Sequence, residues 1–438
     1  MAGIDRRRFL QRAMVGAASC SWLPTLVQAA ADQPSKRRCI VLWMSGGPSQ
    51  VDTFDLKPGH ANGGEFKEIE TNVPGLKISE HLPLLAQQAD KLAILRGMST
   101  KEGDHQRGAY LMHTGQRPGG PLRYPAIGAA LSKELGDPQA DLPNFVSVNP
   151  NAALSQASIS GGFLGPKYAA TTVGQRASYG PPAQGDQPMG PVDLGVDYLQ
   201  LPGEVSADRA EARMKLWRGQ QESFLAARDA AAPKSHDTIF RRAVRMMNPD
   251  AAAAFDLHQE EDAVREAYGN GRFGQGCLIA RRLIERGVPF VEVTHGGDGL
   301  GWDTHQGNFA GVKRLSEELD RGWSTLMREL DERGLLESTT ILWMGEFGRT
   351  PVINGNAGRD HFPDAWSCVL AGGGIAGGQA YGETSEGGEE VVDGKTDVPD
   401  MIATLCAAVG VDPARENISP LARPIKISEG APIRALLS

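Results

Sequence analysis

Acidic, basic and imidazole side chains concentrate in three short segments of this 438-residue chain, at residues 301–305, 345–349 and 358–361. Their sequences are Gly-Trp-Asp-Thr-His, Gly-Glu-Phe-Gly-Arg and Gly-Arg-Asp-His. Carboxylate oxygen and imidazole nitrogen are the usual ligands of zinc- and manganese-like ions. Glycines beside them allow the sharp turns that bring several loops to one point. The recurrence of this pattern predicts a metal or oxyanion site.

Asp303 and His305 are the first pair of predicted metal ligands. They are two residues apart, and in an extended loop this spacing points both side chains the same way, toward one cation. The alternative is a cap for a helix that begins at Asn308, with His305 solvated. We favour the ligand interpretation.

Asp360 and His361 are the second pair. Adjacent side chains diverge in a regular strand, but a glycine-flanked loop can aim both inward or give one to each of two ions. The alternative is a surface turn in which Arg359 pairs with Asp360. We again favour a metal site, with zinc, manganese or calcium as the candidate cation.

Glu346 and Arg349 lie directly after an apolar run. Arg349 has the planar guanidinium that suits phosphate or sulfate, and Glu346 would add a carboxylate ligand to the metal site. A buried ion pair between the two residues, which would shape the turn, fits the sequence equally well. Both interpretations stay open at this stage.

His105 and Arg107 lie in a glycine-punctuated stretch that also holds His113 and Arg117. The grouping suggests oxyanion chemistry, in which Arg107 or Arg349 holds the anion. His105, or a water activated by the cation, would then be the attacking group. A packed, hydrogen-bonded loop is the alternative.

Six apolar runs predict buried strands, and helical patterns separate several of them. The runs are residues 39–44, 92–96, 145–148, 290–294, 339–344 and 367–371, and the main helical stretches are 80–91, 276–286 and 308–333. This order predicts an α/β fold of three layers, α/β/α, with a mostly parallel central sheet. Ligands bind beyond the carboxyl ends of strands in such sheets, so the segments after the runs, including the further candidate ligand His295, should meet at one edge.

A long insertion is predicted before the fourth of these strands. Residues 149–202 are rich in Gly, Ser, Ala and Pro, which indicates long loops or a lid. Charged, alanine-rich helical segments follow at 205–231 and 249–268. We therefore expect a single α/β domain over residues 30–438 with a loop-rich and helical insertion at about 149–270.

The N-terminus resembles a twin-arginine export signal over residues 1–29. Arg6 and Arg7 precede a modest apolar stretch at 13–27, and an Ala-x-Ala-like cleavage site ends at Ala29. The stretch is short for a membrane span, and a lipoprotein anchor at Cys20 is disfavoured. The sequence predicts a periplasmic or extracellular protein.

The chain is acidic, with a formal net charge of −8. Removal of residues 1–29 takes away four arginines and one aspartate, which moves the charge to −11. No basic stripe with interleaved aromatics appears, so nucleic acid is not an expected partner. The cysteines after Cys20 are far apart and lack C-x-x-C spacing, which disfavours a zinc-thiolate site and leaves disulfides optional.

The chain resembles the domain-of-unknown-function family 1501, a group of exported bacterial proteins within the alkaline phosphatase and sulfatase superfamily. The matching stretches are residues 40–55, 301–305, 345–351 and 358–361, followed by the glycine patterns at 371–374 and 377–378. Residues 106–115 more distantly resemble the nucleophile helix of sulfatases. The resemblance covers nearly all of the chain after the signal and implies an alkaline phosphatase-like fold.

Three departures from the superfamily concern the site. Ser45 stands where the superfamily carries an aspartate after the first strand, and His105 is the nearest counterpart of its Ser, Thr or Cys nucleophile. Glu346 and Phe347 replace a metal-binding Asp-His pair, which leaves Asp360-His361 in the position of a later ligand. The resemblance therefore implies the fold but not a two-metal phosphatase mechanism.

We expect an exported metal-dependent hydrolase of phosphate or sulfate esters, acting on an anionic small molecule or a sulfated or phosphorylated glycan. The alternative is a catalytically inactive alkaline phosphatase-like protein that binds an anionic glycan or a cell-envelope protein through the same face. The missing nucleophile favours the inactive protein, whereas the density of ligand-type residues favours the hydrolase. The predicted metal ligands are Asp303, His305, Glu346, Asp360 and His361, and the predicted catalytic residues are His105, Arg107 and Arg349.

Overall fold

The computed structural model describes residues 37–151, 156–174, 191–196, 199, 201–226, 231–296 and 300–438. All of these belong to one compact unit, Arg37–Ser438. The predicted export signal lies outside the described residues. Among the residues that are described, no helix combines the length and apolar character needed to cross a membrane.

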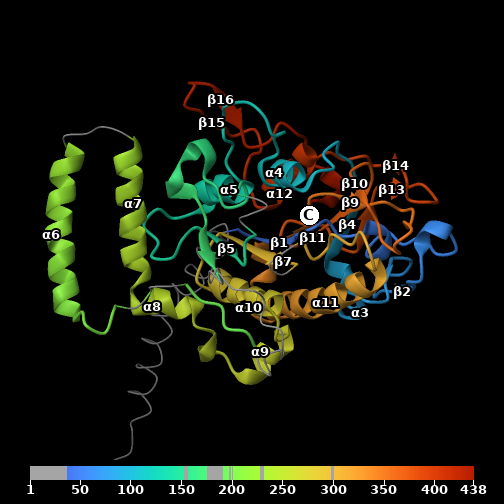
Figure 1. The fold of residues 1–438 in the computed structure, drawn as a ribbon, viewed down its shortest axis with the longest axis horizontal. Coiled ribbons are helices and arrows are strands. Elements are labelled where there is room, and N and C mark those ends of the chain that lie inside the picture. The colour runs from blue at the N-terminus through green and yellow to red at the C-terminus, as the bar shows by residue number, and fades with distance from the viewer. Residues whose placement is uncertain are drawn as a thin grey trace, which may run out of the picture. The chain divides into compact units, whose positions relative to one another are not determined.

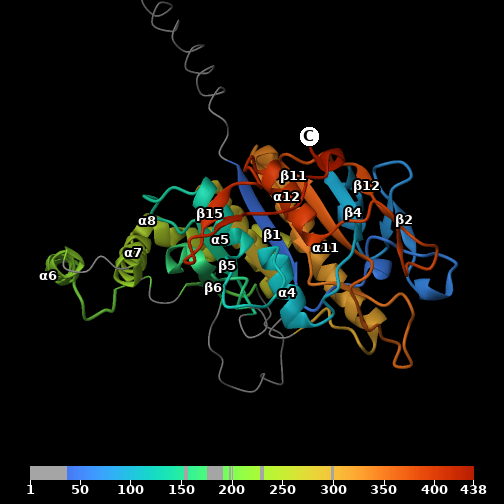
Figure 2. The same ribbon diagram turned by 90° about the horizontal axis from the view of Figure 1, so that it is seen from above.

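An eight-stranded mixed sheet forms the centre of the unit (Figures 1 and 2). In spatial order its strands are β12 (Gln379–Tyr381), β4 (Leu92–Met98), β11 (Trp366–Gly372), β8 (Thr339–Met344), β1 (Arg38–Met44), β7 (Phe290–His295), β5 (Phe145–Val148) and β6 (Thr171–Val173). β11 runs antiparallel to β4 and β8, and the other neighbouring pairs are parallel. All six apolar runs form strands of this sheet, which confirms the prediction of a mostly parallel sheet.

Helices cover both faces of the sheet, as Figure 1 shows. One face carries α10 (Arg272–Glu285) and α11 (Asn308–Glu332), and the other carries α4 (His105–Thr114), α5 (Ile127–Leu135) and α12 (Val398–Ala408). In β1, Ile40 and Leu42 pack into the core beneath α10 and α11, whereas Cys39 and Val41 pack into the core on the opposite face. Because side chains alternate between the faces of a strand, one apolar run serves two cores. The predicted three-layer architecture is confirmed.

The predicted helix at residues 80–91 is broken in the structure. It consists of the single turn α3 (Pro83–Ala86) and the 3-10 turn η3 (Ala89–Lys91). Pro83 starts the turn, because proline suits a position whose amide would have no partner. The buried carboxylate of Asp320 on α11 accepts hydrogen bonds from the next two amides at 2.9 and 2.8 Å. Packing against α11, and not an amphipathic period, therefore shapes this segment.

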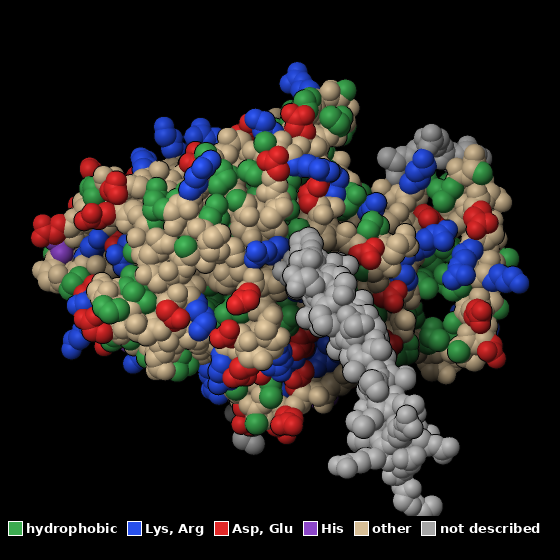
Figure 3. Space-filling view, turned by 180° about the vertical axis from the view of Figure 1, so that it is seen from behind, with side chains coloured by type: hydrophobic (Ala, Val, Ile, Leu, Met, Phe, Trp, Pro, Cys, Tyr) green, Lys and Arg blue, Asp and Glu red, His purple; other side chains and the backbone are tan. Residues whose placement is uncertain are grey.

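The described residues between β5 and α10 include four α-helices. They are α6 (Ala207–Ala226), α7 (Ala231–Met246), α8 (Pro249–Ala252) and α9 (Asp262–Tyr268). Every residue of α6 is at least partly exposed, and the stacked rings of Trp217 and Phe240, 4.0 Å apart at their centroids, join it to α7. α7 in turn contacts the 3-10 turn η5 (Pro166–Tyr168). On the face of the molecule shown in Figure 3, acidic and basic side chains are interspersed.

The cysteines among the described residues are free thiols inside the two cores: Cys39, Cys277, Cys368 and Cys406. Burial raises the pKa of each of these thiols. They therefore act as small apolar side chains in the packing of the sheet.

Candidate metal centre

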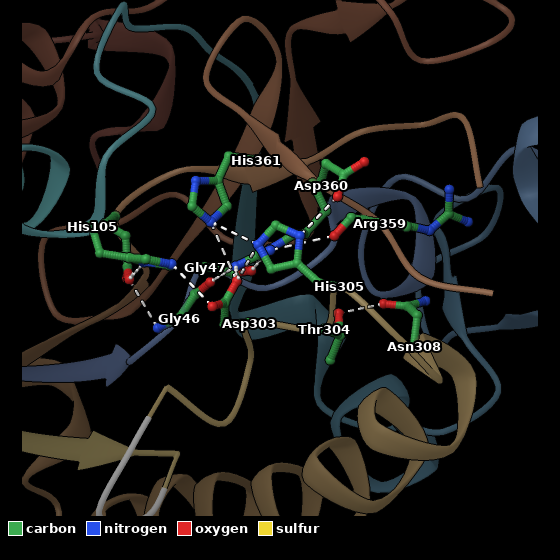
Figure 4. A network of polar contacts seen from close by, with 12 residues as sticks. Gly46, Gly47, His105, Asp303, Thr304, His305, Asn308, Arg359, Asp360 and His361 are labelled. Atoms are coloured by element: carbon green, nitrogen blue, oxygen red, sulfur yellow. Dashed lines mark hydrogen bonds and ion pairs between the residues drawn. The ribbon is translucent and has the colours of Figure 1, made fainter. Parts of the chain in front are cut away.

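Loops that follow three central strands meet at the carboxyl edge of the sheet (Figure 4). The loops after β1, β7 and β8 supply Gly46, Asp303 and Glu346, respectively. Gly46 has a φ of 113°, and a Cβ at this position would lie 2.4 Å from the amide nitrogen of Asp303. Only glycine fits this crossing of two backbones. The crossing sets Asp303 beside the end of the central strand.

Two further segments complete the site. A two-stranded hairpin is formed by β9 (Gly348–Arg349) and β10 (His361–Phe362). The loop between these strands brings Gly358 close to His305. A Cβ on residue 358 would lie 1.9 Å from the carbonyl oxygen of His305. α4 contributes His105 as its first residue, and α4 follows β4 in the chain. The hairpin and the helix therefore bring two more histidines, His361 and His105, to the end of β1.

Three imidazoles surround the carboxylate of Asp303 (Figure 4). Its Oδ1 lies 3.0 Å from Nε2 of His305 and 3.3 Å from Nε2 of His361. Its Oδ2 lies 3.3 Å from Nε2 of His105. The Nε2 atoms of His305 and His361 are themselves 3.0 Å apart. In every ring it is thus Nε2 that faces the carboxylate.

The outer ring nitrogens determine the tautomer of each histidine. Each Nδ1 lies 2.7 Å from an oxygen that accepts a hydrogen bond: Glu346 Oε1 for His105, Asp360 Oδ1 for His305 and the Gly103 carbonyl for His361. Each Nδ1 therefore carries a proton and donates it, which leaves the lone pair of the neutral ring on Nε2. Metal-binding histidines have the same arrangement, with the outer nitrogen held by a carboxylate or carbonyl.

The donor atoms fit a cation. Those of His105, Asp303 and His361 lie within 4.8 Å of one another. Lone pairs that converge beside an anionic oxygen repel one another unless a positive charge lies between them. Imidazole nitrogen together with one carboxylate suits zinc or a similar transition metal better than calcium, which prefers oxygen ligands.

Electrostatics in the cluster keep Asp303 ionised. Burial opposes its charge, but hydrogen bonds from His105 and His361 and the guanidinium of Arg349, at 2.6 Å, outweigh burial and lower the pKa of Asp303. Burial likewise opposes a charge on His105, yet Asp303 and Glu346 outweigh it and raise the pKa of His105 to about 9. In the metal-free protein a proton therefore occupies the position on His105 that a cation would take.

This raised pKa predicts how the stability of the metal-free protein depends on pH. The folded state holds the His105 proton more tightly than the unfolded state, so its contribution is complete below the ordinary pKa of 6.5 and is lost as the pH rises through about 9. We expect the unfolding temperature in chelator to fall across this window, and part of the fall to disappear in His105→Gln. His258→Gln, at a side chain 71% exposed, should keep the wild-type slope. Equal slopes in all three proteins would contradict the assignment.

Glu346 and Asp360, predicted as metal ligands, lie behind the histidines in this structure. Glu346 is buried, and its Oε1 also accepts from the amide of Gly46 at 2.9 Å. The carboxylate of Asp360 is 54% exposed and accepts from the side chain of Asn354 at 3.2 Å. Both carboxylates contact the outer nitrogens of the rings, so they orient His105 and His305 instead of facing the centre of the cluster.

Arg349 is fully buried, and each nitrogen of its guanidinium donates a hydrogen bond within the protein. Nε donates to the Gly47 carbonyl at 3.0 Å, Nη1 to the Arg359 carbonyl at 3.3 Å, and Nη2 to the Gly46 carbonyl and to Asp303. Its ion-pair partner is thus Asp303 and not Glu346. With its donors occupied, Arg349 positions Asp303 and is not arranged to hold a substrate oxyanion.

Arg107 does not join the cluster either. Its guanidinium makes two hydrogen bonds to Glu102, at 2.6 and 2.9 Å, and its side chain is 52% exposed. The two other histidines with supporting sequence context are core residues. His113 bonds to Glu292 at 3.1 Å, and His295 lies 3.3 Å from Glu318. The structure therefore selects three of the five candidate histidines for the cluster.

A buried ion pair that the sequence analysis missed supports the loop before His361. Arg359 donates to both carboxylate oxygens of Asp52, at 2.7 and 3.0 Å, and neither residue is exposed to solvent. Asn308 donates to the same carboxylate at 2.8 Å. The expected alternative, an exposed pair between Arg359 and Asp360, is not formed. The position of Asp52 inside the segment at 40–55 was the only sequence signal for this pair.

Solved structures with a similar path of the chain include a sulfatase, a lipoteichoic acid synthase and a protein in the alkaline phosphatase superfamily. The PsFucS1 sulfatase from Pseudoalteromonas sp. is 13% identical, with a TM-score of 0.40 over 89% of this chain and 70% of that chain. The lipoteichoic acid synthase LtaP from Listeria monocytogenes is 8% identical, with a TM-score of 0.37 over 87% and 75%. A protein in the alkaline phosphatase superfamily from Vibrio parahaemolyticus is 10% identical, with a TM-score of 0.35 over 86% and 67%.

No curated protein shows significant sequence similarity to the chain. The family described as "Protein of unknown function (DUF1501)" matches residues 36–437. This match spans nearly the whole chain and includes every residue of the histidine cluster. The chain therefore belongs to the DUF1501 family.

Proposed function

We propose that the cluster of His105, Asp303, His305 and His361 binds a transition-metal cation and supports hydrolysis of phosphate or sulfate esters by an exported protein. The observation that carries this proposal is the common orientation of the three rings. Each outer nitrogen is held by an acceptor, and each inner nitrogen faces one ionised carboxylate.

A bound cation would supply Lewis acidity, which polarises an ester oxygen and lowers the pKa of a water molecule. The protein supplies the geometry for this chemistry. Glu346 and the Gly103 carbonyl hold the rings of His105 and His361 in their ligand tautomers. Arg349 fixes the carboxylate of Asp303. Arg107, two residues after His105 and half exposed, is our candidate for contact with the anionic group of the substrate, which would replace its present partner Glu102.

His305 decides between an open and a closed site. Catalytic zinc sites keep one position free beside three protein ligands, whereas structural sites use four. His305 is the most exposed of the three rings, with 44% of its side chain accessible. If it swings away with Asp360, then His105, Asp303 and His361 leave an open position for substrate. If it binds the cation permanently, the closed set favours the second candidate function, a catalytically inactive protein that binds an anionic glycan or cell-envelope partner.

The test is turnover of aryl phosphate and aryl sulfate esters by the purified protein loaded with zinc or manganese. We expect hydrolysis with one ester class, loss of hydrolysis in chelator, and loss of both bound metal and hydrolysis in His361→Ala. His258→Ala should behave as wild type because His258 lies on the exposed surface. A protein that binds no metal would remove the proposal.

The variant His305→Ala separates the two candidates. For a hydrolase with three ligands, metal stays bound at a stoichiometry of one, because His105, Asp303 and His361 are untouched. For a closed four-ligand site, metal affinity falls sharply and the wild type shows no turnover. Stoichiometric metal in the wild type without hydrolysis of either ester class would support the binding role.

A further inference from the structure

A second polar pocket lies at the opposite edge of the sheet from the histidine cluster. It encloses about 50 Å³ between α7, the turn η5, the end of α5 and the start of β5. Asn144 and Phe145 line it at the amino end of β5, whereas the histidine cluster follows the carboxyl ends of β1, β7 and β8. The pocket therefore takes no part in the chemistry proposed above.

Four basic side chains line this pocket: Lys133, Lys167, Arg242 and Arg245. Lys133 is neutralised by Glu134 at 3.2 Å. For Arg242 and Arg245, no carboxylate of the described residues lies within ion-pair distance. The neighbouring Arg241, by contrast, pairs with Asp237 at 2.8 Å. On α7, the arginines that line the pocket therefore lack a carboxylate partner among the described residues, whereas Arg241 has one.

These two guanidiniums are partly withdrawn from water. Nη2 of Arg242 donates to the Lys167 carbonyl at 2.5 Å, and Nε of Arg245 is buried without a hydrogen-bond partner. Burial, followed by the charge of Arg245, lowers the pKa of Arg242. The one carboxylate in the lining, Asp137, is exposed and accepts from the amide of Gln139 at 2.8 Å. The pocket therefore holds uncompensated positive charge.

We propose that this pocket binds a phosphate- or sulfate-sized oxyanion through Arg242 and Arg245, and that the anion fastens α7 to the sheet. A guanidinium fork matches such oxyanions with two parallel hydrogen bonds, and charge-assisted bonds of this kind are the strong ones. The volume exceeds the roughly 10–15 Å³ that a single water molecule needs, so the pocket has room for a small ion. The ligand is either a free ion or the terminal group of a larger molecule.

Calorimetric titration and thermal unfolding with inorganic phosphate and sulfate, at ionic strength held constant with chloride, test the proposal. Wild type should bind one of these ions saturably and unfold at a higher temperature in its presence. The double variant Arg242→Gln/Arg245→Gln should bind at least about tenfold more weakly. The matched control is Arg213→Gln/Arg218→Gln, which removes the same charge from exposed positions on α6 and should retain wild-type affinity.

The stability of the same variants, measured with and without the ion, gives a second readout. A purely structural role of Arg242 and Arg245 would not make their effect on stability depend on the ion. Without phosphate or sulfate, the double variant should be at least as stable as wild type, because repulsion between two partly buried charges has been removed. With the ion, wild type should become the more stable protein. Arg242→Lys/Arg245→Lys, which keeps the charge, should recover part of the affinity and covers the case in which glutamine prevents folding.

Glucose 6-phosphate distinguishes the two sources of the oxyanion. Tighter binding of the sugar phosphate than of phosphate identifies a terminal group, and binding of the ion alone identifies a free ion. Equal affinities of wild type and the double variant, or no saturable binding by wild type, would overturn the proposal. Because the histidine cluster is intact in every variant, these outcomes are independent of hydrolysis.

Discussion

Replacement of Asp303 by asparagine should abolish stoichiometric metal binding and ester hydrolysis together. Its carboxylate contacts three imidazole nitrogens and the guanidinium of Arg349. Asparagine keeps the shape but removes the negative charge, and its amide group would direct hydrogens at Nε2 atoms or at the guanidinium. We therefore expect a loss of metal affinity greater than the roughly 100-fold that marks the upper end for residues behind the ligands.

Asp360→Asn is the matched comparison, because it makes the same chemical change one step farther from the centre. Within the cluster Asp360 contacts the outer nitrogen of His305, so its loss should cost roughly 10- to 100-fold or less in metal affinity. Elemental analysis and zinc titration of both folded variants give the two values. Equal losses in Asp303→Asn and Asp360→Asn would contradict the central role of Asp303.

The elements that position the cluster could be predicted because their signals are local. Apolar runs gave all six central strands, and the rule that ligands collect at carboxyl ends of strands brought residues 301–305 and 358–361 to one edge. The prediction of one helix over residues 80–91 was wrong because the structure of this segment depends on contacts that are not local. Tertiary contacts with α11 determine its conformation, and they include the hydrogen bond from the amide of Leu85 to Asp320. The spacing of apolar residues in the segment does not predict these contacts.

The roles within the cluster could not be predicted, because loops have no fixed side-chain period. Whether Glu346 faces the centre of the cluster or the back of His105 depends on where the Gly46 turn crosses residue 303, 257 positions later in the chain. Sequence spacing also made Glu346 the natural partner of Arg349, yet the crossing gives that guanidinium to Asp303. The sequence offers His105 or a cation-activated water as the attacking group, whereas the structure places Nε2 of His105 beside Asp303, among the candidate ligands. The position of His105 after β4 was the available cue to this arrangement.

Removal of the buried charge on Asp52 should lower the free energy of unfolding more than the loss of any exposed ion pair. Asp52 and Arg359 are both excluded from solvent and share two hydrogen bonds. Breaking such a pair leaves one charge buried without compensation, which costs about 3–5 kcal/mol. Asp52→Asn should therefore lower the free energy of unfolding by this amount, measured by chemical denaturation. Arg359→Met should cost at least as much, because it also leaves the carbonyls of Pro351 and Asn62 without a donor.

The control is Lys426→Gln, which breaks an exposed pair with Glu429 at 3.0 Å and should leave stability nearly unchanged. The double variant Asp52→Asn/Arg359→Met should cost less than the sum of the single changes, since no unpaired charge remains buried. The effect should also reach the site, because Arg359 precedes Asp360 and His361, whose positions depend on the loop it anchors. We therefore expect the folded fraction of Asp52→Asn to bind metal more weakly than the folded fraction of Lys426→Gln. Equal stability and equal metal affinity in these two variants would show that the buried pair does not support the cluster.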